Sequence, residues 1–374
     1  MSGARLRVGV LGAGTVGREV VRALLIRPDD LRASDGATLE LTAVAVGDPA
    51  RGAAAGVPAE LLSDAPAHLV ADEEIDIIVE LMGGDEPAHT LIAAALSMGK
   101  SVVTANKHVI AHHGPELETI ARRTGAALRF EAAVGGGIPV LGPLATDLAA
   151  NRVTRVRGIV NGTTNFILGA MTDEDDPVEF AAALAEAQRL GYAEADPSGD
   201  IEGHDAVNKL VILARLGFDR WLDPATIPTR PDGADGPAGP GIATVSLGDQ
   251  AHARAAGRII RLVATAVADP DGVLRAAVLP TALPLDSALG RTAGVRNRIE
   301  VDATPVGRVG FDGPGAGGPA TSSAVLGDLI AVARAAGSTW GPRREARARS
   351  GDAVSRPETG LMTTASGIRY PIDD

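Results

Sequence analysis

The distribution of apolar residues predicts that short strands alternate with helices in the first third of the chain. Four runs rich in Val, Ile and Leu have the length and composition of buried strands. They are Arg5–Leu11, Leu39–Val46, Ile75–Leu81 and Ser101–Thr104. The segments Arg18–Ile26 and Ala88–Met98 instead space their apolar residues at helical intervals. Strands that alternate with helices are typical of a parallel, doubly wound sheet, so we expect an α/β fold of the Rossmann type.

The pattern changes from about residue 140 onward. Before that point, a further strand is expected at Ala127–Val134, and a Gly-rich turn follows it. The later elements that we expect are a strand within 153–162, helices at Val178–Leu190, Gly203–Leu216, Ala251–Ala266 and Ala324–Ala336, and a second Gly-rich turn at Gly310–Gly318. Pro228–Gly241 is dense in Pro and Gly, which predicts a mobile surface loop. The residues after Gly337 are rich in Arg and Ser, and we expect them to be disordered.

Composition narrows the classes of function. The chain has 374 residues and a formal net charge of −12, from 35 Lys and Arg against 47 Asp and Glu. A net negative surface repels nucleic acids and anionic membranes, so neither is expected as a partner. No apolar run approaches the roughly 18 residues of a membrane span, and the first strand is too short for a secretory signal, so we expect a cytoplasmic protein. The absence of cysteine excludes disulfides and every aldehyde dehydrogenase mechanism that passes through a thioester.

Residues 12–17 read GAGTVG and lie between an expected strand and an expected helix. In this G-x-G-x-x-G pattern, Gly12 permits the turn, Gly14 lets the backbone approach a pyrophosphate, and Gly17 allows close packing of helix and strand. Thr15 and Val16 complete the loop at the helix N-terminus, where N–H groups favour an anion. The sequence therefore predicts a dinucleotide site.

The end of the second strand leaves the choice between NAD and NADP open. Asp48 has the carboxylate that binds ribose hydroxyls in NAD enzymes, whereas Arg51 has the charge that meets a 2′-phosphate. The two residues favour opposite cofactors.

Two stretches contain polar residues that are candidates for catalysis or ligand binding. Thr104 and Lys107 follow a parallel strand at its carboxyl end, where open α/β sheets bind their ligands. Asp205 and Lys209 are four residues apart on an expected helix and therefore share one face. With Glu194 and Asp200 nearby, this pair can bind a zwitterionic amino acid and move a proton. Taken alone, however, an Asp–Lys pair at this spacing is more often an ordinary surface salt bridge.

Two further groups raise the question of metal binding. Glu131 and the carbonyl groups of 135–138 provide oxygen ligands that suit a Na⁺ or K⁺ ion better than a transition metal, although a loop without an ion is equally compatible. His108 and His112 have the i,i+4 spacing of helical zinc ligands. They lack a third ligand in the pattern, so we interpret them, with His113, as helix-surface residues.

Taken in order, the motifs GAGTVG, VTANK, FEAAVGGGIP, VNGTTNFIL, GYAEADPSGDIEGHDAVNKL and GFDGPGAGGPATSSAVLGDL resemble those of the homoserine dehydrogenases. The resemblance extends from about Leu6 to Ala336. It implies reversible, NAD(P)H-dependent reduction of L-aspartate 4-semialdehyde to L-homoserine, on the route to threonine and methionine. It also implies a homodimer and a discontinuous dinucleotide-binding domain, 1–140 completed by 305–338. Residues 141–304 would form an α/β substrate-binding and dimerisation domain, and 339–374 a disordered tail.

The resemblance also implies roles for individual residues. Lys209 matches the proton donor to the carbonyl oxygen, with Asp205 beside it, and Lys107 matches a second active-site lysine near nicotinamide and substrate. Glu194 and Asp205 match groups that bind the substrate's polar ends, and Asp200 supports them. Thr163 matches a substrate contact, and the backbone at Gly191 and Gly317 matches positions that line substrate or cofactor. The matches to the ligands of a monovalent cation are Glu131, Val134, Gly136 and Ile138, three of them through backbone carbonyls.

The chain departs from the family pattern in two ways. The stretch after the last family helix is too short for the regulatory amino-acid-binding domain that many members carry, so we expect none. Gly47 occupies the position where many members have Arg, which weakens the case for strict NADP preference. Two rival hypotheses are another nicotinamide enzyme for a related amino acid and a catalytically silent dinucleotide sensor. The presence of both lysines and the carboxylates disfavours each of them.

Overall fold

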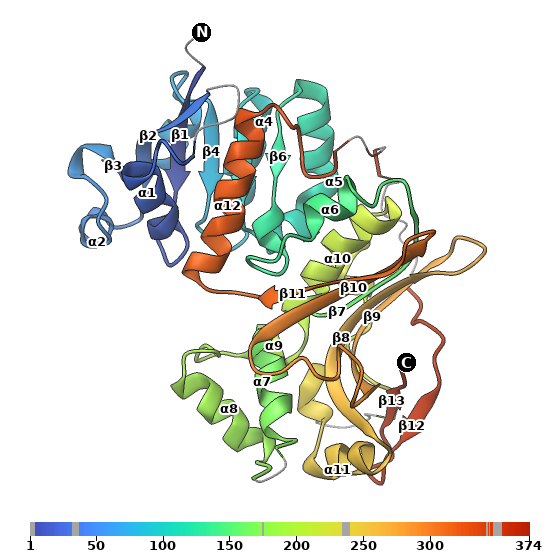
Figure 1. The fold of residues 1–374 in the computed structure, drawn as a ribbon. Helices are drawn as coiled ribbons and strands as arrows, with labels where there is room; N and C mark the ends of the chain where they lie inside the picture. The colour runs from blue at the N-terminus through green and yellow to red at the C-terminus, as the bar shows by residue number, and fades with distance from the viewer. Residues whose placement is uncertain are drawn as a thin grey trace. The chain divides into compact units, whose positions relative to one another are not determined.

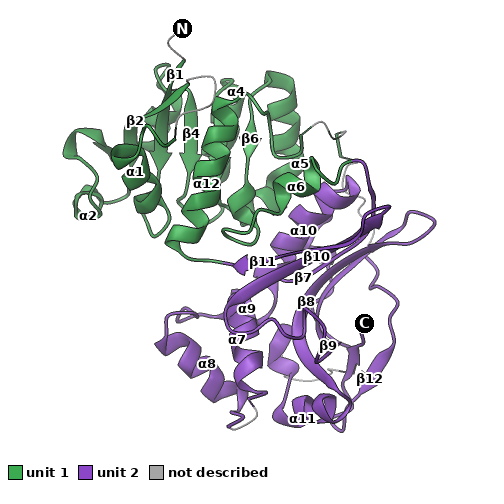
Figure 2. Cartoon of the chain, in the orientation of Figure 1, with its two compact units in different colours: residues 1–149, 316–348 green, residues 150–315, 349–374 purple. Residues whose placement is uncertain are grey.

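The computed structural model describes residues 4–31, 37–173, 176–233, 240–341, 343, 345–346 and 354–374. The chain divides into two compact units, which are coloured separately in Figure 2. Unit 1 comprises 1–149 and 316–348, and unit 2 comprises 150–315 and 349–374. Within the described residues, no helix is both long enough and apolar enough to cross a bilayer.

Unit 1 is built on a six-stranded parallel sheet with the strand order β3-β2-β1-β4-β5-β6 (Figure 1). Its strands are β1 (Arg5–Leu11), β2 (Thr38–Ala45), β3 (Leu62–Ser63), β4 (Ile77–Glu80), β5 (Ser101–Thr104) and β6 (Leu128–Arg129). Its helices are α1 (Gly17–Ile26), α2 (Pro49–Ala54), α3 (Pro66–Ala71), α4 (Ala88–Ser97), α5 (Lys107–Thr124), α6 (Leu141–Ala145) and α12 (Gly318–Ala333), with 3₁₀ turns at Ala59–Leu61 and Glu131–Ala133. This strand order is that of dinucleotide-binding folds, so the predicted fold class is confirmed.

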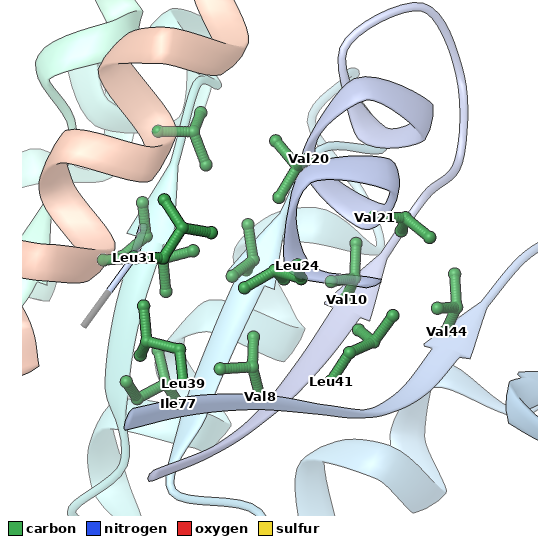
Figure 3. Packing of buried hydrophobic residues seen from close by; sticks show 14 of the residues in the cluster. Val8, Val10, Val20, Val21, Leu24, Leu31, Leu39, Leu41, Val44 and Ile77 are labelled. Atoms are coloured by element: carbon green, nitrogen blue, oxygen red, sulfur yellow. The ribbon is translucent and has the colours of Figure 1, made fainter. Parts of the chain in front are cut away.

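The core of unit 1 lies between its sheet and the helices α1 and α12. Val8 and Val10 of β1 are fully buried, and they meet Val20 and Leu24 of α1 (Figure 3). Burial of each such side chain stabilises the fold by about 1.5–3 kcal/mol. Val325 of α12 joins the same cluster, which explains why a helix so late in the sequence belongs to the first unit.

Unit 2 contains a five-stranded antiparallel sheet with the order β11-β10-β7-β8-β9. Its strands are β7 (Arg152–Ile159), β8 (Arg258–Ala268), β9 (Leu274–Pro284), β10 (Arg296–Thr304) and β11 (Gly307–Pro314), with a separate hairpin of β12 (Leu361–Thr363) and β13 (Arg369–Pro371). Its helices are α7 (Gly162–Ala170), α8 (Phe180–Arg189), α9 (Ser198–Ile201), α10 (His204–Phe218) and α11 (Leu247–Ala255), with 3₁₀ turns at Pro224–Thr226 and Gly241–Thr244. Almost all of α10 is buried, from Ala206 to Gly217.

Several predicted elements were wrong in part. The helix expected at Ala251–Ala266 ends at Ala255, and strand β8 begins at Arg258. Gly257, at φ +71°, allows this change of direction, and the β-branched residues after it favour a strand. The strand expected at Ala127–Val134 is limited to β6 and continues as a 3₁₀ turn. Most of the expected turn at Gly310–Gly318 belongs to β11. Residues 234–239 of the expected mobile loop lie outside the described residues.

The expectation of a disordered tail was wrong for residues 354–374 and also for Thr339 and Trp340, which are buried. The segment 354–374 contains the β12–β13 hairpin, and the side chain of Tyr370 is fully buried in unit 2. The Tyr370 hydroxyl donates to Oδ2 of Asp249 at 3.1 Å, and Asp373 pairs with Arg157 at 2.6 Å. The Arg- and Ser-rich composition of the tail as a whole gave no indication of these contacts of Tyr370 and Asp373. Residues 342, 344 and 347–353 of the tail lie outside the described residues.

Candidate active-site residues in the two units

The glycine loop after β1 has the geometry of a close-approach site. Gly12 adopts φ +99°, and a Cβ there would lie 2.7 Å from the carbonyl oxygen of Leu81. A Cβ on Gly17 would lie 2.0 Å from the carbonyl oxygen of Gly12, whereas a Cβ on Gly14 would meet nothing within 4 Å. Gly12 and Gly17 are therefore required by packing, and Gly14 leaves its backbone open to a ligand. Thr15 and Val16 connect this loop to α1, and α12 begins after Gly317, at φ +107°.

At the end of β2, the carboxylate of Asp48 caps α2. Its Oδ1 accepts a hydrogen bond from the N–H of Ala50 at 2.9 Å, and Nε of Arg51 lies 3.5 Å from Oδ2. Both side chains are largely exposed, and a Cβ on Gly47 would meet nothing within 4 Å. The two residues that favour opposite cofactors are thus paired with each other, and their contacts leave the choice open.

The ends of β4 and β5 are joined by a buried hydrogen-bond network that positions the start of α5. Glu80 is fully buried and accepts from Oγ1 of Thr104 at 2.6 Å and from the N–H of Met82 at 2.8 Å. Oγ1 of Thr104 accepts from the N–H of Asn106, whose side-chain oxygen caps α5 by accepting from Val109 N. Lys107, the first residue of α5, is fixed by this network. The sequence reasoning missed Glu80, although an acidic residue directly after the apolar run Ile77–Val79 was a signal.

The carboxylate of Glu131 caps the N-terminus of α6. It accepts hydrogen bonds from the backbone N–H groups of Val140, Leu141 and Gly142 at 2.7, 2.8 and 2.7 Å. Burial raises the pKa of the Glu131 carboxyl, and the nearby charge of Asp328 raises it further against the opposing effect of these hydrogen bonds. Both carboxylate oxygens are therefore engaged by N–H donors.

The other three expected cation ligands lie in the same loop of unit 1, between β6 and α6. Val134 follows the Glu131–Ala133 turn, and Gly136 adopts φ +58°. Ile138 is buried, and its N–H donates to the carbonyl of Gly135 at 2.9 Å. Backbone carbonyls remain the chemically suitable ligands at these positions.

In unit 2, the ammonium group of Lys209 is buried within a network of polar side chains. Its Nζ donates to the carbonyl oxygen of Val160 at 2.6 Å and to Oδ2 of Asp205 at 2.7 Å. The side chains of Lys209 and Asp205 are only 11% and 12% exposed, so this pair is not the ordinary surface salt bridge that its spacing alone would suggest. It combines a buried acid–base group with a fixed counter-charge.

Asn161 connects the two candidate carboxylates of this network. Its Nδ2 donates to Oδ1 of Asp200 at 2.7 Å and to Oδ2 of Asp205 at 2.8 Å. Its side-chain oxygen accepts from the N–H of Thr164 and so caps α7. Burial raises the pKa of the Asp200 carboxyl; the hydrogen bond from Asn161 opposes this shift, and the charge of Asp205 adds to it. The sequence reasoning missed Asn161, whose position before GTT is a typical N-cap signal.

The remaining expected substrate residues lie on two neighbouring segments of unit 2. Oγ1 of Thr163 donates to the carbonyl of Tyr192 at 2.7 Å, which links the start of α7 to the loop after α8. Gly191 adopts φ +75° in that loop. Glu194 is exposed on the same loop, where its carbonyl accepts from Nε2 of Gln188. Among the contacts of the described residues, the Lys209 network thus includes Asp200 and Asp205, and the Glu194 side chain lies outside it.

Two protein-family models together match most of the chain. The model described as homoserine dehydrogenase, NAD binding domain, matches residues 12–131, and the model described as homoserine dehydrogenase matches residues 139–330. The homoserine dehydrogenase of Corynebacterium glutamicum is 44% identical over 336 residues, 89% of this chain and 73% of that protein. The Bacillus subtilis homoserine dehydrogenase is 38% identical over 87% of this chain and 72% of its own length.

Solved structures agree with the sequence comparisons. A homoserine dehydrogenase from Thiobacillus denitrificans matches with a TM-score of 0.82 and 38% identity, covering 89% of this chain and 74% of that one. A hyperthermophilic archaeal homoserine dehydrogenase, solved in complex with NADPH, matches with a TM-score of 0.70 and 29% identity, covering 87% and 97%. The chain therefore belongs to the homoserine dehydrogenase family, NAD(P)-dependent oxidoreductases that interconvert L-aspartate 4-semialdehyde and L-homoserine on the route to threonine and methionine.

Proposed function

We propose that Lys209 is the proton donor in this reaction. Reduction of an aldehyde builds negative charge on its oxygen, and a positioned ammonium group stabilises that charge and supplies the proton. The observation that carries the proposal is the burial of Lys209 Nζ between Asp205 and the carbonyl of Val160. Asp205 keeps the ammonium group charged and oriented, and Asn161 in turn orients Asp205.

The residues of unit 1 fit a dinucleotide. Gly12, Gly14 and Gly17, with Thr15 and Val16, would hold the pyrophosphate, and Thr104, Lys107 and Gly317 would line the nicotinamide side. Support comes from the open space above Gly14 and from the family model that matches residues 12–131. A bound reduced nicotinamide would supply the hydride. Lys107 would bind the substrate carboxylate, because an ammonium group at a helix N-terminus favours an anion.

The remaining substrate contacts are assigned to unit 2. Glu194 and Asp205 would bind the polar ends of homoserine, Asp200 would support Asp205, and Thr163 and the Gly191 backbone would line the substrate. Their support is the hydrogen bond from Thr163 to Tyr192, which fixes the loop carrying Gly191 and Glu194. We therefore assign cofactor binding to unit 1. Its bounds, 1–149 and 316–348, differ from the expected 1–140 and 305–338, because β11 pairs with β10 and so places residues 307–314 in unit 2. Substrate binding and dimerisation are assigned to unit 2, expected as 141–304.

A monovalent cation, Na⁺ or K⁺, would be held by backbone carbonyls of Glu131, Val134, Gly136 and Ile138. The Glu131 carboxylate already accepts three N–H groups, so it would act by shaping the loop. Comparing turnover in Na⁺, K⁺ and tetramethylammonium chloride at equal ionic strength tests this assignment. We further propose a cytoplasmic homodimer, as expected of a biosynthetic enzyme for a small polar substrate; light scattering of the purified chain measures its mass.

The role of Lys209 is tested with the nearly isosteric variant Lys209→Met. Oxidation of L-homoserine, followed by nicotinamide absorbance with NAD⁺ and NADP⁺, is expected to fall by about 10³-fold or more, within the range of general acid–base catalysis. Binding of NADPH, followed by its fluorescence, should remain within about twofold of wild type. A variant that retains a tenth of the wild-type kcat would contradict the proposed proton transfer. A variant that loses NADPH binding would instead assign Lys209 to the cofactor site.

A further inference from the structure

A second cluster of ionisable side chains lies on α4 and α5 of unit 1, apart from the residues assigned above. It consists of His89 on α4 and of His113 and Glu116 on α5. One potential ligand atom from each residue lies within 4.8 Å of the others. His89 and His113 are partly buried, whereas the carboxylate of Glu116 is half exposed, so a solvated ion could reach all three. We refer to these three residues as the histidine cluster.

The surroundings of His89 favour a cation. Its Nδ1 lies 3.1 Å from Oε1 of Glu86, and its Nε2 lies 3.1 Å from Oε2 of Glu116. A neutral imidazole has one N–H and one lone pair, so it can donate to one of these carboxylates and would turn its lone pair toward the other. A positive charge between Nε2 and Glu116 removes that repulsion. A metal ion bound to Nε2 supplies such a charge.

The ligand types of the histidine cluster, and the distance between His89 and Glu116, fit a metal ion of the first transition row. Zinc bonds to imidazole nitrogen and carboxylate oxygen of about 2.0–2.2 Å place two ligands of one ion roughly 3.0–3.5 Å apart. The 3.1 Å between Nε2 of His89 and Oε2 of Glu116 lies in this range. Two imidazoles and one carboxylate suit Zn²⁺, Co²⁺, Ni²⁺ or Fe²⁺ rather than Mg²⁺ or Ca²⁺.

Neighbouring carboxylates provide the second set of contacts that metal-bound histidines commonly have. Glu86 faces Nδ1 of His89, and Oδ1 of Asp85 lies 2.8 Å from Nε2 of His113. With its Nε2–H donating to Asp85, His113 carries its lone pair on Nδ1. The charge of Asp85, Glu86 and Glu116 also attracts a divalent cation.

We propose that His89, His113 and Glu116 bind one divalent transition-metal ion, with Zn²⁺ as the representative, and thereby link α4 to α5. The rings of His89 and His113 are stacked with centroids 3.8 Å apart and planes at 14°. One ion cannot lie in both ring planes in that arrangement, so binding tilts the His113 ring out of the stack. His108 and His112, whose rings stack on each other at 4.1 Å, are not part of the site.

Co²⁺ is the first probe, because its visible absorption reports ligand type and coordination. The full chain, free of any affinity tag and treated with EDTA, is titrated with CoCl₂, and ZnCl₂ is then added in competition. We expect one equivalent of Co²⁺ to give a visible spectrum that Zn²⁺ abolishes. His89→Gln, His113→Gln and Glu116→Gln should each weaken Co²⁺ binding by about 10- to 100-fold.

His68→Gln and Glu60→Gln are matched controls, because both residues are exposed in the same unit. They should bind Co²⁺ like wild type. The metal-free turnover of His89→Gln should stay within about twofold of wild type, which shows that the variant is folded. The proposal is overturned if wild type gives no Co²⁺ spectrum, if His89→Gln and Glu116→Gln keep it, or if the controls lose it equally.

Discussion

The two candidate lysines are held in their units by different means. Lys209 lies in the middle of α10, with its ammonium group buried against Asp205 and the carbonyl of Val160. Lys107 is the first residue of α5 and partly exposed, and its position depends on the cap that Asn106 provides. The carboxylate of Asp205 lies against the charge of Lys209, whereas Lys107 lies where a helix N-terminus favours an anion. If Lys209 is the proton donor proposed above, its substitution should affect both catalysis and folding stability, whereas substitution of Lys107 should affect stability much less.

The largest effect expected from this difference concerns stability. Lys209→Met leaves the buried Asp205 carboxylate without its cation, and loss of one partner of a buried pair costs about 3 kcal/mol or more. Lys107→Met should change the free energy of unfolding by less than about 0.5 kcal/mol, as for most surface substitutions. Urea unfolding followed by circular dichroism measures both changes.

The double variant Lys209→Met with Asp205→Asn serves as the control for this prediction. Removing both charges takes away the uncompensated carboxylate, so the double variant should be more stable than Lys209→Met alone. Equal losses for Lys209→Met and Lys107→Met would show that the burial of Lys209 does not distinguish the two lysines energetically.

A smaller difference is expected between the two asparagine caps. Asn106→Ala removes the cap of α5 and should cost about 1 kcal/mol. Asn161→Ala removes the cap of α7 and also the amide that bridges Asp200 and Asp205, so its cost should be about 2 kcal/mol or more. Asn161→Ala should also lower kcat by about tenfold, because Asp205 loses its orienting partner. Thermal unfolding measures the loss of stability, and homoserine oxidation measures kcat. Equal losses of stability and equal kcat values for the two variants would mean that Asn161 acts only as a helix cap.

The same contrast explains how far the sequence could predict the molecule. The glycine loop and the strands β1, β2, β4 and β5 are defined by patterns local in sequence, which were sufficient to predict them. The spacing of Asp205 and Lys209 predicted that they share a helix face, but not that the pair is buried. Asn161 and Lys209 belong to elements far apart in the chain, and only the fold brings Val160 and Asn161 to the α10 helix. The predicted bounds of the short strand β6 and the predicted boundary between α11 and β8 were wrong, because tertiary pairing rather than periodicity decides where these elements begin and end.

Acidity should affect the Lys209 network through Asp200. Burial raises the pKa of its carboxyl, so the folded chain binds this proton more tightly than the unfolded chain does. Stability from this group is therefore fully present below the unfolded pKa of about 3.9 and decreases as the pH rises through the higher folded value. Asp200→Asn removes that decrease, so the free energy of unfolding of the variant relative to wild type should rise from pH 4 to pH 7. Unfolding in urea across this range measures the trend, and a constant difference would contradict it.

The smallest expected effects are at the end of β2, where Asp48 and Arg51 are exposed and paired with each other. If the ribose of the cofactor lies there, Arg51→Gln should lower the ratio of kcat/KM for NADP⁺ over NAD⁺ by about tenfold, the value of one charged contact of roughly 1.4 kcal/mol. Asp48→Asn should raise the same ratio, because it removes repulsion of the 2′-phosphate while an amide oxygen can still cap α2. Initial rates with both cofactors measure the ratio. Since the two changes are expected in opposite directions, a shift of both variants in the same direction would mean that the ion pair acts on α2 as a whole and that cofactor preference is set elsewhere in unit 1.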